Sequence, residues 1–443
     1  MSSLTCVPCQ HHLQSPLSLW ERLGEGAGGT DFINPDRPAK FNIHNKQPAL
    51  LTVNLNFAEE KKSLTTSVME HSGRRKTNNF TTRNRKCALL LLLLPIALLL
   101  FLPILASAQS QLEVVKVADG VYAALRKEPP GLTTNANSVF IINEEDVVVV
   151  DTTLTPGTAR ELLAAIRKLT SKPVKYVINT HWHDDHIVGN QVFRAAFPAA
   201  EFIAHANTRS YLPGAGLTNR QNAMSPQGYP QFINALRRSL AKNQSLSGAP
   251  LTEEERTTYA SDLRIAESYM AENPGVQIVL PTITFEDQIT LHCGSREIQI
   301  KYLGRGHTSG DIIAYLPQEG IVVAGDLVIA PVPYVGNPQS HPGDWSASLE
   351  RLLALKPKII IPGHGPVMRD DSYVRLMARL FRSIKTQVEA AVARGESLEQ
   401  TRKSVDLSEF EKLFAGESVM RREIFRGYVV GPAVGAAYAD AKK

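Results

Sequence analysis

Short apolar runs separated by turn residues make up most of the pattern from residue 112 onward. Runs of this kind are typical of β-strands. They predict strands at 112–117, 121–125, 138–142, 147–150, 174–178, 298–303, 312–316, 321–324 and 359–361. A helical period begins at Pro156, after the fourth strand, and another begins at residue 344. Strands that alternate with helices in this way predict mixed sheets covered by helices, a layered α/β domain.

Two stretches are helical instead. Residues 207–275 contain a predicted helix at 231–242 and another that begins at Thr252, where Glu255 completes a capping box. We interpret this stretch as a helical insertion, which either packs on the core or covers the functional site. Helical patterns also dominate 369–443, which predicts a C-terminal helical extension packed on a main domain of residues 109–368.

An uncharged run of 20 residues, Cys87 to Ala106, precedes the patterned part of the chain. Basic residues come before it and Ala106-Ser107-Ala108 follow, which is typical of a secretory signal peptide cleaved after Ala108. At about 1.5 Å per residue, residues 87–106 are also long enough to cross a bilayer, so an uncleaved inner-membrane anchor is the alternative. Either reading places the domain outside the cytoplasm, in the periplasm or secreted.

The residues before this run have a different composition. Residues 1–68 are rich in Asn, Thr, Gly and Pro and lack apolar periodicity. We interpret them as non-structured or as a mis-assigned start, because Met69 would begin a signal segment of ordinary length, 69–108.

The net charge of +5 would suggest an anionic partner, but its distribution along the chain argues otherwise. Residues 1–108 hold 12 Lys and Arg against 7 Asp and Glu, so the remaining 335 residues hold 36 of each. A neutral body favours a small-molecule substrate over nucleic acid, and no membrane contact is expected beyond the signal peptide or anchor. Cys293 is the only cysteine after residue 108, which excludes an intrachain disulfide there.

Four candidate metal ligands lie within six residues after the strand at 174–178: His181, His183, Asp185 and His186. Side chains alternate in an extended segment, so the first three are expected to point the same way, with His186 turned aside at the start of a helix. This arrangement suits two adjacent metals. Without a cation, the packed imidazoles and carboxylate would remain polar groups to satisfy.

Three further candidates lie in glycine-containing turns at the ends of predicted strands: His307 in GRGHT, Asp326 in AGD and His364 in PGHG. Glycine permits tight turns that hold a ligand at a fixed angle.

Several neighbouring residues have less specific interpretations. Asp311 either accepts the free N–H of a ligand histidine or has an ordinary turn role. His205, which ends a strand, and His292 are interpreted as structural. The loop 330–343, with Tyr334, is a candidate substrate wall or a plain loop, and Asp344 is predicted to cap the following helix.

In this order the seven candidates resemble the metallo-β-lactamase superfamily of metal-dependent hydrolases, over roughly residues 115–368. The resemblance implies a four-layer αββα sandwich with metals at one edge of the sheets. It implies two ligand sets: His181, His183 and His307 at one metal, and Asp185, His186 and His364 at the other, with Asp326 bridging them. Two zinc ions per chain are the default for such ligands, with iron or manganese as alternatives.

The chemistry implied by this resemblance is hydrolysis. A water held between two cations loses a proton near neutral pH and attacks the substrate, while Asp185 orients the hydroxide or shuttles its proton. We expect an ester, lactone, thioester or amide substrate, with β-lactams included. The alternative is a mononuclear iron oxidoreductase resembling persulfide dioxygenases. A metal-binding module without catalysis is a third hypothesis, disfavoured because all seven ligands are present.

Overall fold

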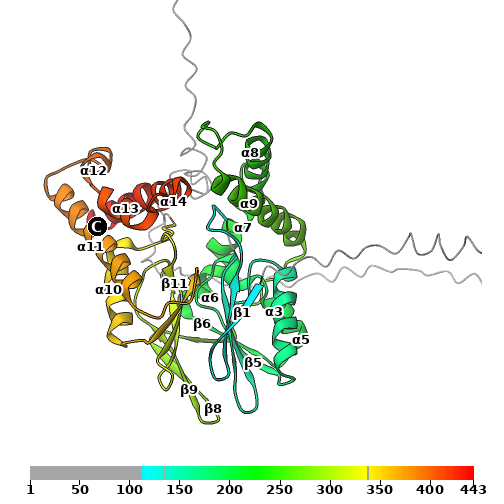
Figure 1. Ribbon diagram of the computed structural model, residues 1–443. Coiled ribbons are helices and arrows are strands. Elements are labelled where there is room, and N and C mark those ends of the chain that lie inside the picture. The colour runs from blue at the N-terminus through cyan, green and yellow to red at the C-terminus, as the bar shows by residue number, and fades with distance from the viewer. Residues whose placement is uncertain (1–111, 134, 337–338) are drawn as a thin grey trace, which may run out of the picture. The chain divides into compact units, whose positions relative to one another are not determined.

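Two β-sheets packed face to face form the centre of the computed structural model, which describes residues 112–133, 135–336 and 339–443 (Figure 1). The predicted signal peptide and residues 1–68 lie outside the described residues. The first sheet contains, in spatial order, β1 (Leu112–Ala118), β2 (Val121–Arg126), β3 (Ser138–Ile142), β4 (Val147–Val150), β5 (Val174–Ile178), β6 (Glu201–His205) and β7 (Ile283–Phe285). Its strands are antiparallel from β1 to β4 and parallel from β4 to β7.

The second sheet has the order β12-β11-β10-β9-β8. Its strands are β8 (Gln288–Cys293), β9 (Arg296–Tyr302), β10 (Ile312–Leu316), β11 (Ile321–Ile329) and β12 (Ile359–His364). The two sheets share an apolar core to which Val148, Ile178, Ile300 and Val323 belong. Every residue of β4 is buried, because this strand has the core on one face and a helix layer on the other.

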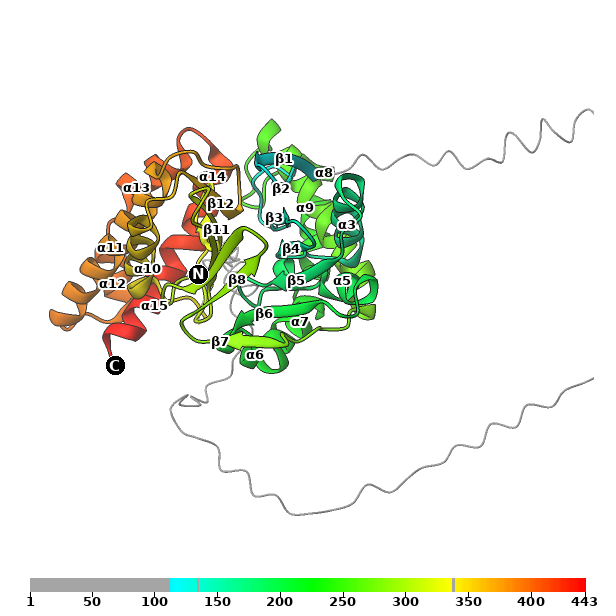
Figure 2. The same ribbon diagram turned by 90° about the horizontal axis from the view of Figure 1, so that it is seen from below.

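Helices cover the outer face of each sheet and complete four layers, the αββα sandwich (Figure 2). On the first sheet lie α3 (Pro156–Leu169) and α5 (Asn190–Ala196). The short α4 (Asp184–Ile187) comes between β5 and α5. On the second sheet lie α10 (Pro342–Ala354) and α11 (Ser372–Ala393). A capping box at Thr155 starts α3, and Leu162 and Ile166 bury its apolar face against β4 and β5.

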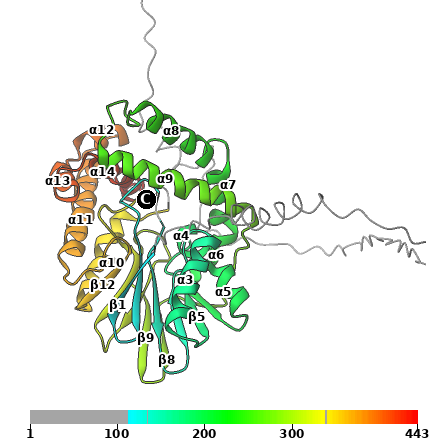
Figure 3. The ribbon, with the colours of Figure 1, turned by 45° about the vertical axis from the view of Figure 1, so that its right-hand side comes forward.

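The stretch between β6 and β7 is helical. It contains α6 (Ala206–Tyr211), the π-helix η1 (Leu212–Gly216), α7 (Leu217–Met224), α8 (Tyr229–Lys242), α9 (Glu253–Glu272) and the 3-10 helix η2 (Asn273–Gly275). Figure 3 shows α8 and α9 crossing the end of the sandwich opposite the β8–β9 hairpin. We refer to residues 206–275 as the insertion.

The C-terminal helices follow α11, and the last of them packs against both α10 and α11. They are α12 (Leu398–Ser404), α13 (Ser408–Ala415), α14 (Val419–Phe425), the π-helix η3 (Arg426–Val430) and α15 (Gly431–Ala441). Their buried side chains, including Phe414, Phe425 and Val434, join the apolar core between the second sheet and α11. None of the described helices combines the length and the apolar character that crossing a bilayer requires.

The structure corrects three predictions made from the sequence. The apolar pattern misses β7 and β8, whose side chains are mostly only half-buried and therefore leave a weak signal. The strand predicted to end before Asp326 continues to Ile329, because Gly325 takes a positive φ of 50° and shifts the register against β12. Asp344 does not cap α10: the helix begins at Pro342, and Asp344 accepts a hydrogen bond from Arg305 instead.

Candidate metal centre

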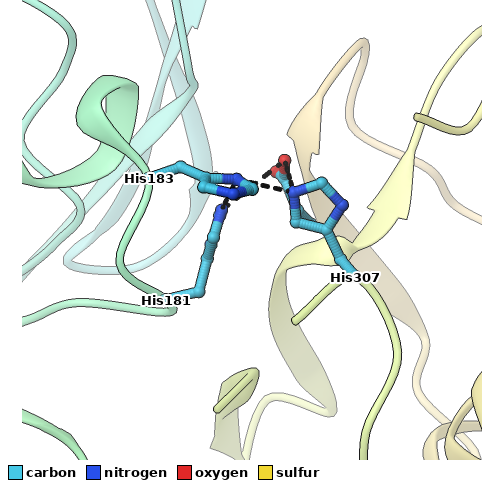
Figure 4. Close-up of side chains that lie close together, drawn as sticks. His181, His183 and His307 are labelled. Carbon is cyan, nitrogen blue, oxygen red and sulfur yellow. Dashed lines mark hydrogen bonds and ion pairs between the residues drawn. The ribbon is translucent and has the colours of Figure 1, made fainter. Parts of the chain in front are cut away.

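Three histidines from two sheets converge on one point (Figure 4). His181 and His183 follow β5, and His307 lies between β9 and β10. His183 Nδ1 lies 3.0 Å from His181 Nε2 and 2.8 Å from His307 Nε2. Asp326 completes this group, with its Oδ2 3.4 Å from His307 Nε2 and 3.9 Å from His181 Nε2. We call these four residues the three-histidine cluster.

A second group lies beside the first. Asp185 and His186 belong to α4, and His364 is the last residue of β12. Asp185 Oδ2 lies 3.2 Å from His364 Nε2 and 3.5 Å from His186 Nε2. The other oxygen of Asp326, Oδ1, lies 3.3 Å from His186 Nε2 and 3.5 Å from His364 Nε2. Asp185, His186 and His364 form the second cluster, and Asp326 contacts both clusters through different oxygens.

The structure therefore brings together all seven candidates named from the sequence, with one correction to how they point. Helix α4 begins at Asp184, earlier than expected, so Asp185 and His186 both lie in its first turn. The Asp185 side chain therefore points toward the same cluster as His186. It does not point the same way as His181 and His183, as it would in an extended segment.

The ring nitrogens of three histidines that point away from the clusters form hydrogen bonds with acceptors outside the two clusters. His186 Nδ1 lies 2.7 Å from Asp151 Oδ2, and His307 Nδ1 lies 3.0 Å from the carbonyl oxygen of Tyr334. Because Thr180 donates its hydroxyl hydrogen to Asp151, its oxygen accepts from His181 Nδ1 at 3.2 Å. In its neutral form each of these imidazoles thus carries its proton on Nδ1 and directs the lone pair of Nε2 inward, as metal-binding histidines do.

Burial and the carboxylates divide the histidines into two electrostatic classes. Burial lowers the pKa of His181 and His307, and lowers that of His183 to about 3, so these imidazoles are neutral at pH 7. Burial also opposes a charge on His186 and His364, but the carboxylates of Asp326 and Asp185 outweigh it. They raise the pKa of both, that of His364 to about 10.

The residues fit divalent cations. Within the described part of the chain, His186 Nε2 and Asp326 Oδ1 are buried without a hydrogen-bond partner, although they face each other at 3.3 Å. When the ring is neutral, the lone pairs of these two atoms repel at this distance, and a divalent cation between them removes the repulsion, since ligands of one zinc ion are roughly 3–4 Å apart. Gly363 leaves the necessary room, because a β-carbon there would lie 1.9 Å from Asp326 Oδ1.

The structure separates the alternatives for the neighbouring residues. Asp311 has the turn role: it accepts from the amide and hydroxyl of Thr308 rather than from the ring of a ligand histidine. His205 is held structurally, with Nε2 donating to the carbonyl of Glu286 and its ring against Tyr302, and His292 is exposed. The role of the loop at 330–343 as a substrate wall stays a prediction.

Two residues of the centre escaped the sequence analysis, Asp151 and Thr180. Asp151 directly follows β4, which runs parallel to β5 with Val150 opposite Ile178, so it lies beside the motif that follows β5. It accepts from the amide and hydroxyl of Thr180 and from His186. The available signal was an aspartate at the end of a wholly buried strand. The residues around Asp151 do not indicate that its partner is a histidine 35 positions away.

A loop beside the centre is held by the insertion and the C-terminal helices. The amides of Leu132 and Thr133 donate to the carboxylate of Asp262 in α9, at 3.0 and 3.2 Å. Tyr428 in η3 donates to the carbonyl of Leu132. Further along the same β2–β3 connection, the amide of Asn137 donates to the carbonyl of Gly363, the residue before His364. The insertion therefore contacts a segment that reaches the centre, while its role as a cover stays a prediction.

Asp262 should make the stability of the protein depend on pH. Burial raises its pKa to about 7, although the two loop amides oppose the rise. Between about pH 4 and pH 7 the folded protein holds a proton that the unfolded chain releases, so this group's contribution to stability falls as the pH rises. We expect the stability of wild type relative to Asp262→Asn to fall by on the order of 2 kcal/mol from pH 5 to pH 8, measured by urea unfolding.

A fully exposed carboxylate gives the matched control. Asp119 lies at the surface in an ion pair with Lys116, which holds the pKa of its carboxyl below the usual value. Asp119→Asn should therefore keep a constant offset from wild type over the same pH range. Parallel stability curves for wild type and Asp262→Asn would contradict the expectation.

Comparison with known proteins identifies relatives across this region. A family model described as the metallo-beta-lactamase superfamily matches residues 132–364, more than half of the chain. The linear primary-alkylsulfatase of Pseudomonas sp. (strain ATCC 19151) is 25% identical over 243 residues, 54% of this chain but only 43% of that protein. The metallo-beta-lactamase type 2 of Bacillus sp. (strain 170) is 25% identical over 241 residues, 54% of this chain and 69% of that protein.

Solved structures include a metallo-beta-lactamase from Pontibacter korlensis. It is 21% identical, with a TM-score of 0.42, and the match covers 61% of this chain and 99% of that one.

Proposed function

This chain belongs to the metallo-β-lactamase superfamily, and we propose that it is a hydrolase working with two divalent cations, zinc by preference. One observation carries the proposal: two ligand clusters share Asp326, whose two oxygens face different groups of histidines. A single-metal site does not need both clusters. The nitrogen and oxygen donors suit zinc, and iron and manganese are the alternatives.

We propose that the three-histidine cluster holds one cation and the second cluster holds the other. Bound cations of this kind supply Lewis-acid chemistry, because they acidify water and withdraw electrons from the bond to be cleaved. The chain's own residues orient the ligands. Asp151, Thr180 and the carbonyl of Tyr334 fix the imidazoles, and Asp326 places one negative charge between the clusters.

Asp185 is the proposed proton carrier. Its side chain is 20% exposed, whereas that of Asp326 is 5% exposed. A group that passes a proton to a leaving group needs access to the substrate and to solvent. Asp185 is the more accessible of the two carboxylates. We therefore assign the proton transfer to Asp185, and we assign to Asp326 the binding of the cations.

The proposed substrates are small molecules with an ester, lactone, thioester or amide bond, β-lactams included. The alkylsulfatase among the relatives adds an alkyl sulfate ester to this set. Export to the periplasm or medium remains part of the proposal, and it rests on the sequence of residues 87–108.

Metal analysis combined with a substrate panel tests the proposal. We expect about two zinc ions per purified chain, hydrolysis of at least one substrate of the panel, loss of activity on chelation and recovery when zinc is restored. One iron per chain with oxygen uptake on a persulfide would instead establish the oxidoreductase. Two bound metals without turnover of any member of the panel would contradict hydrolysis of these substrate classes.

A further inference from the structure

Asp184 lies between two candidate ligands, His183 and Asp185, but belongs to neither cluster. Its carboxylate contacts the insertion instead. Oδ2 accepts from Arg220 Nε at 3.0 Å and from the Tyr269 hydroxyl at 2.6 Å, and Oδ1 accepts from Arg220 Nη2. The carboxylate of Asp184 is thus bound by a bidentate guanidinium and a phenol together.

The two partners come from different helices of the insertion. Arg220 belongs to α7, and Tyr269 belongs to α9. Tyr269 is itself fixed, because it packs with Leu154 and Ile265 in a small apolar core and its ring lies 4.8 Å from that of Tyr229. The contact therefore joins α4 to residues that are 36 and 85 positions away in sequence.

This contact is well shielded from water. The side chains of Arg220 and Asp184 are 10% and 20% exposed. Fork-to-fork hydrogen bonds between Arg and a carboxylate combine charge with a fixed geometry. If one partner is removed, the other is left as a poorly solvated charge, so the contact resists small displacements.

Helix α4 depends on contacts of this kind. It has only four residues, too few to be stable by its own hydrogen bonds, and its cap residue His183 makes no side-chain cap hydrogen bond. The Asp184 side chain anchors the first residue of the helix. The next two residues, Asp185 and His186, supply two of the three ligands of the second cluster.

We propose that Arg220 and Tyr269 are positioning residues that, by binding Asp184, hold Asp185 and His186 in the geometry of the second cluster. The insertion is then a structural part of the second metal site. This inference rests on the proposed binding of two metals. It distinguishes the two clusters, because Asp185 and His186 follow Asp184 within α4, whereas His183 precedes the helix and His307 and Asp326 are carried by other elements.

The variants isolate this contact. Arg220→Met removes the guanidinium but keeps an unbranched side chain, Arg220→Lys keeps the charge without the fork, and Tyr269→Phe removes one oxygen atom. Arg237→Met is the matched control, because Arg237 makes an exposed ion pair with Glu267 inside the same insertion. All are made in the full chain and checked for folding by circular dichroism.

Zinc affinity, measured by titration against a competing chelator, gives the readout. We expect Arg220→Met to weaken one of the two equivalents by about 10- to 100-fold, the range for groups that orient metal ligands. Arg220→Lys and Tyr269→Phe should lower the affinity for the same zinc equivalent by at least about threefold, because each removes only part of the contact that orients the ligands. Arg237→Met should bind both equivalents as wild type does.

Second variants identify which site is affected. In a His307→Ala background the remaining metal belongs to the second cluster, and Tyr269→Phe should weaken it. In a His364→Ala background the remaining metal belongs to the three-histidine cluster, and Tyr269→Phe should leave its affinity unchanged. A general loss of stability would affect both backgrounds equally, so equal effects overturn the inference.

The outcomes separate the inference from the proposed function. If wild type binds two metals and Tyr269→Phe and Arg220→Lys bind both with wild-type affinity, only the positioning role is wrong. If wild type binds fewer than two, the proposed function fails and this inference fails with it.

Discussion

Asp326→Ala is expected to lower turnover by on the order of a thousandfold or more, because metal-ion stabilisation of a transition state contributes several kcal/mol. Asp326 contacts histidines of both clusters, through Oδ2 with His307 and His181 and through Oδ1 with His186 and His364. Its loss removes one ligand from each cluster and the negative charge between them. Metal content and kcat/KM of the purified variant test the expectation.

Asp344→Ala is the control for this substitution. Asp344 also lies on the side of the second sheet, but it is exposed and pairs with Arg305 rather than with a histidine. The control should keep wild-type metal content and activity. Wild-type rates in a metal-depleted Asp326→Ala protein would show that the seven residues are not the catalytic centre.

Trp345→Ala is expected to lower the free energy of unfolding by about 3–5 kcal/mol, the usual cost of truncating a buried tryptophan. The indole is fully buried in α10 and stacks on Phe381 of α11, with ring centroids 4.3 Å apart. Its Nε1 donates to the carbonyl of Leu327 at 3.1 Å, which ties both helices to β11. The truncation leaves a cavity and an unpaired carbonyl at the same place.

The measurement is urea unfolding with a chelator present, so that loss of metal does not contribute to the difference. Trp345→Phe keeps a ring for the stack on Phe381 but removes the N–H donor, and it should be less destabilised than Trp345→Ala. The indole also lies against the turn of His307, with ring centroids 5.7 Å apart. If Trp345→Ala lowers the free energy of unfolding by less than about 1 kcal/mol, Trp345 does not stabilise the packing of α10 and α11 on β11.

The layers and the candidate ligands of the centre were predictable from local patterns. Strands β3 and β4 of the first sheet show as buried apolar runs, and α3 shows through Pro156 at its start and its apolar face. The histidines and aspartates were identifiable because four of them crowd into six residues, and the other three follow strands in glycine-rich turns. Such signals survive in a sequence because each depends on neighbours within a few positions.

The resemblance to the superfamily implied which residues share a cluster, and the tertiary structure supplies the physical reason. Asp185 joins His186 and His364 because α4 begins at Asp184, and Asp326 contacts both clusters because β11 continues past Gly325. These boundaries depend on packing between elements and on register across the sheet. Local propensity leaves them undetermined by one or two residues, which is enough to redirect a side chain.

Local patterns in the chain and the family resemblance were therefore enough to predict the fold class, the types of the candidate metal ligands and their order along the chain. Only the tertiary structure revealed the contacts that hold those ligands: Asp151 on His186, the carbonyl of Tyr334 on His307, and Arg220 on Asp184. Each of these contacts joins residues 27 to 36 positions apart. Hydrophobic periodicity records which face of an element is buried, but it does not record which distant polar group that element meets.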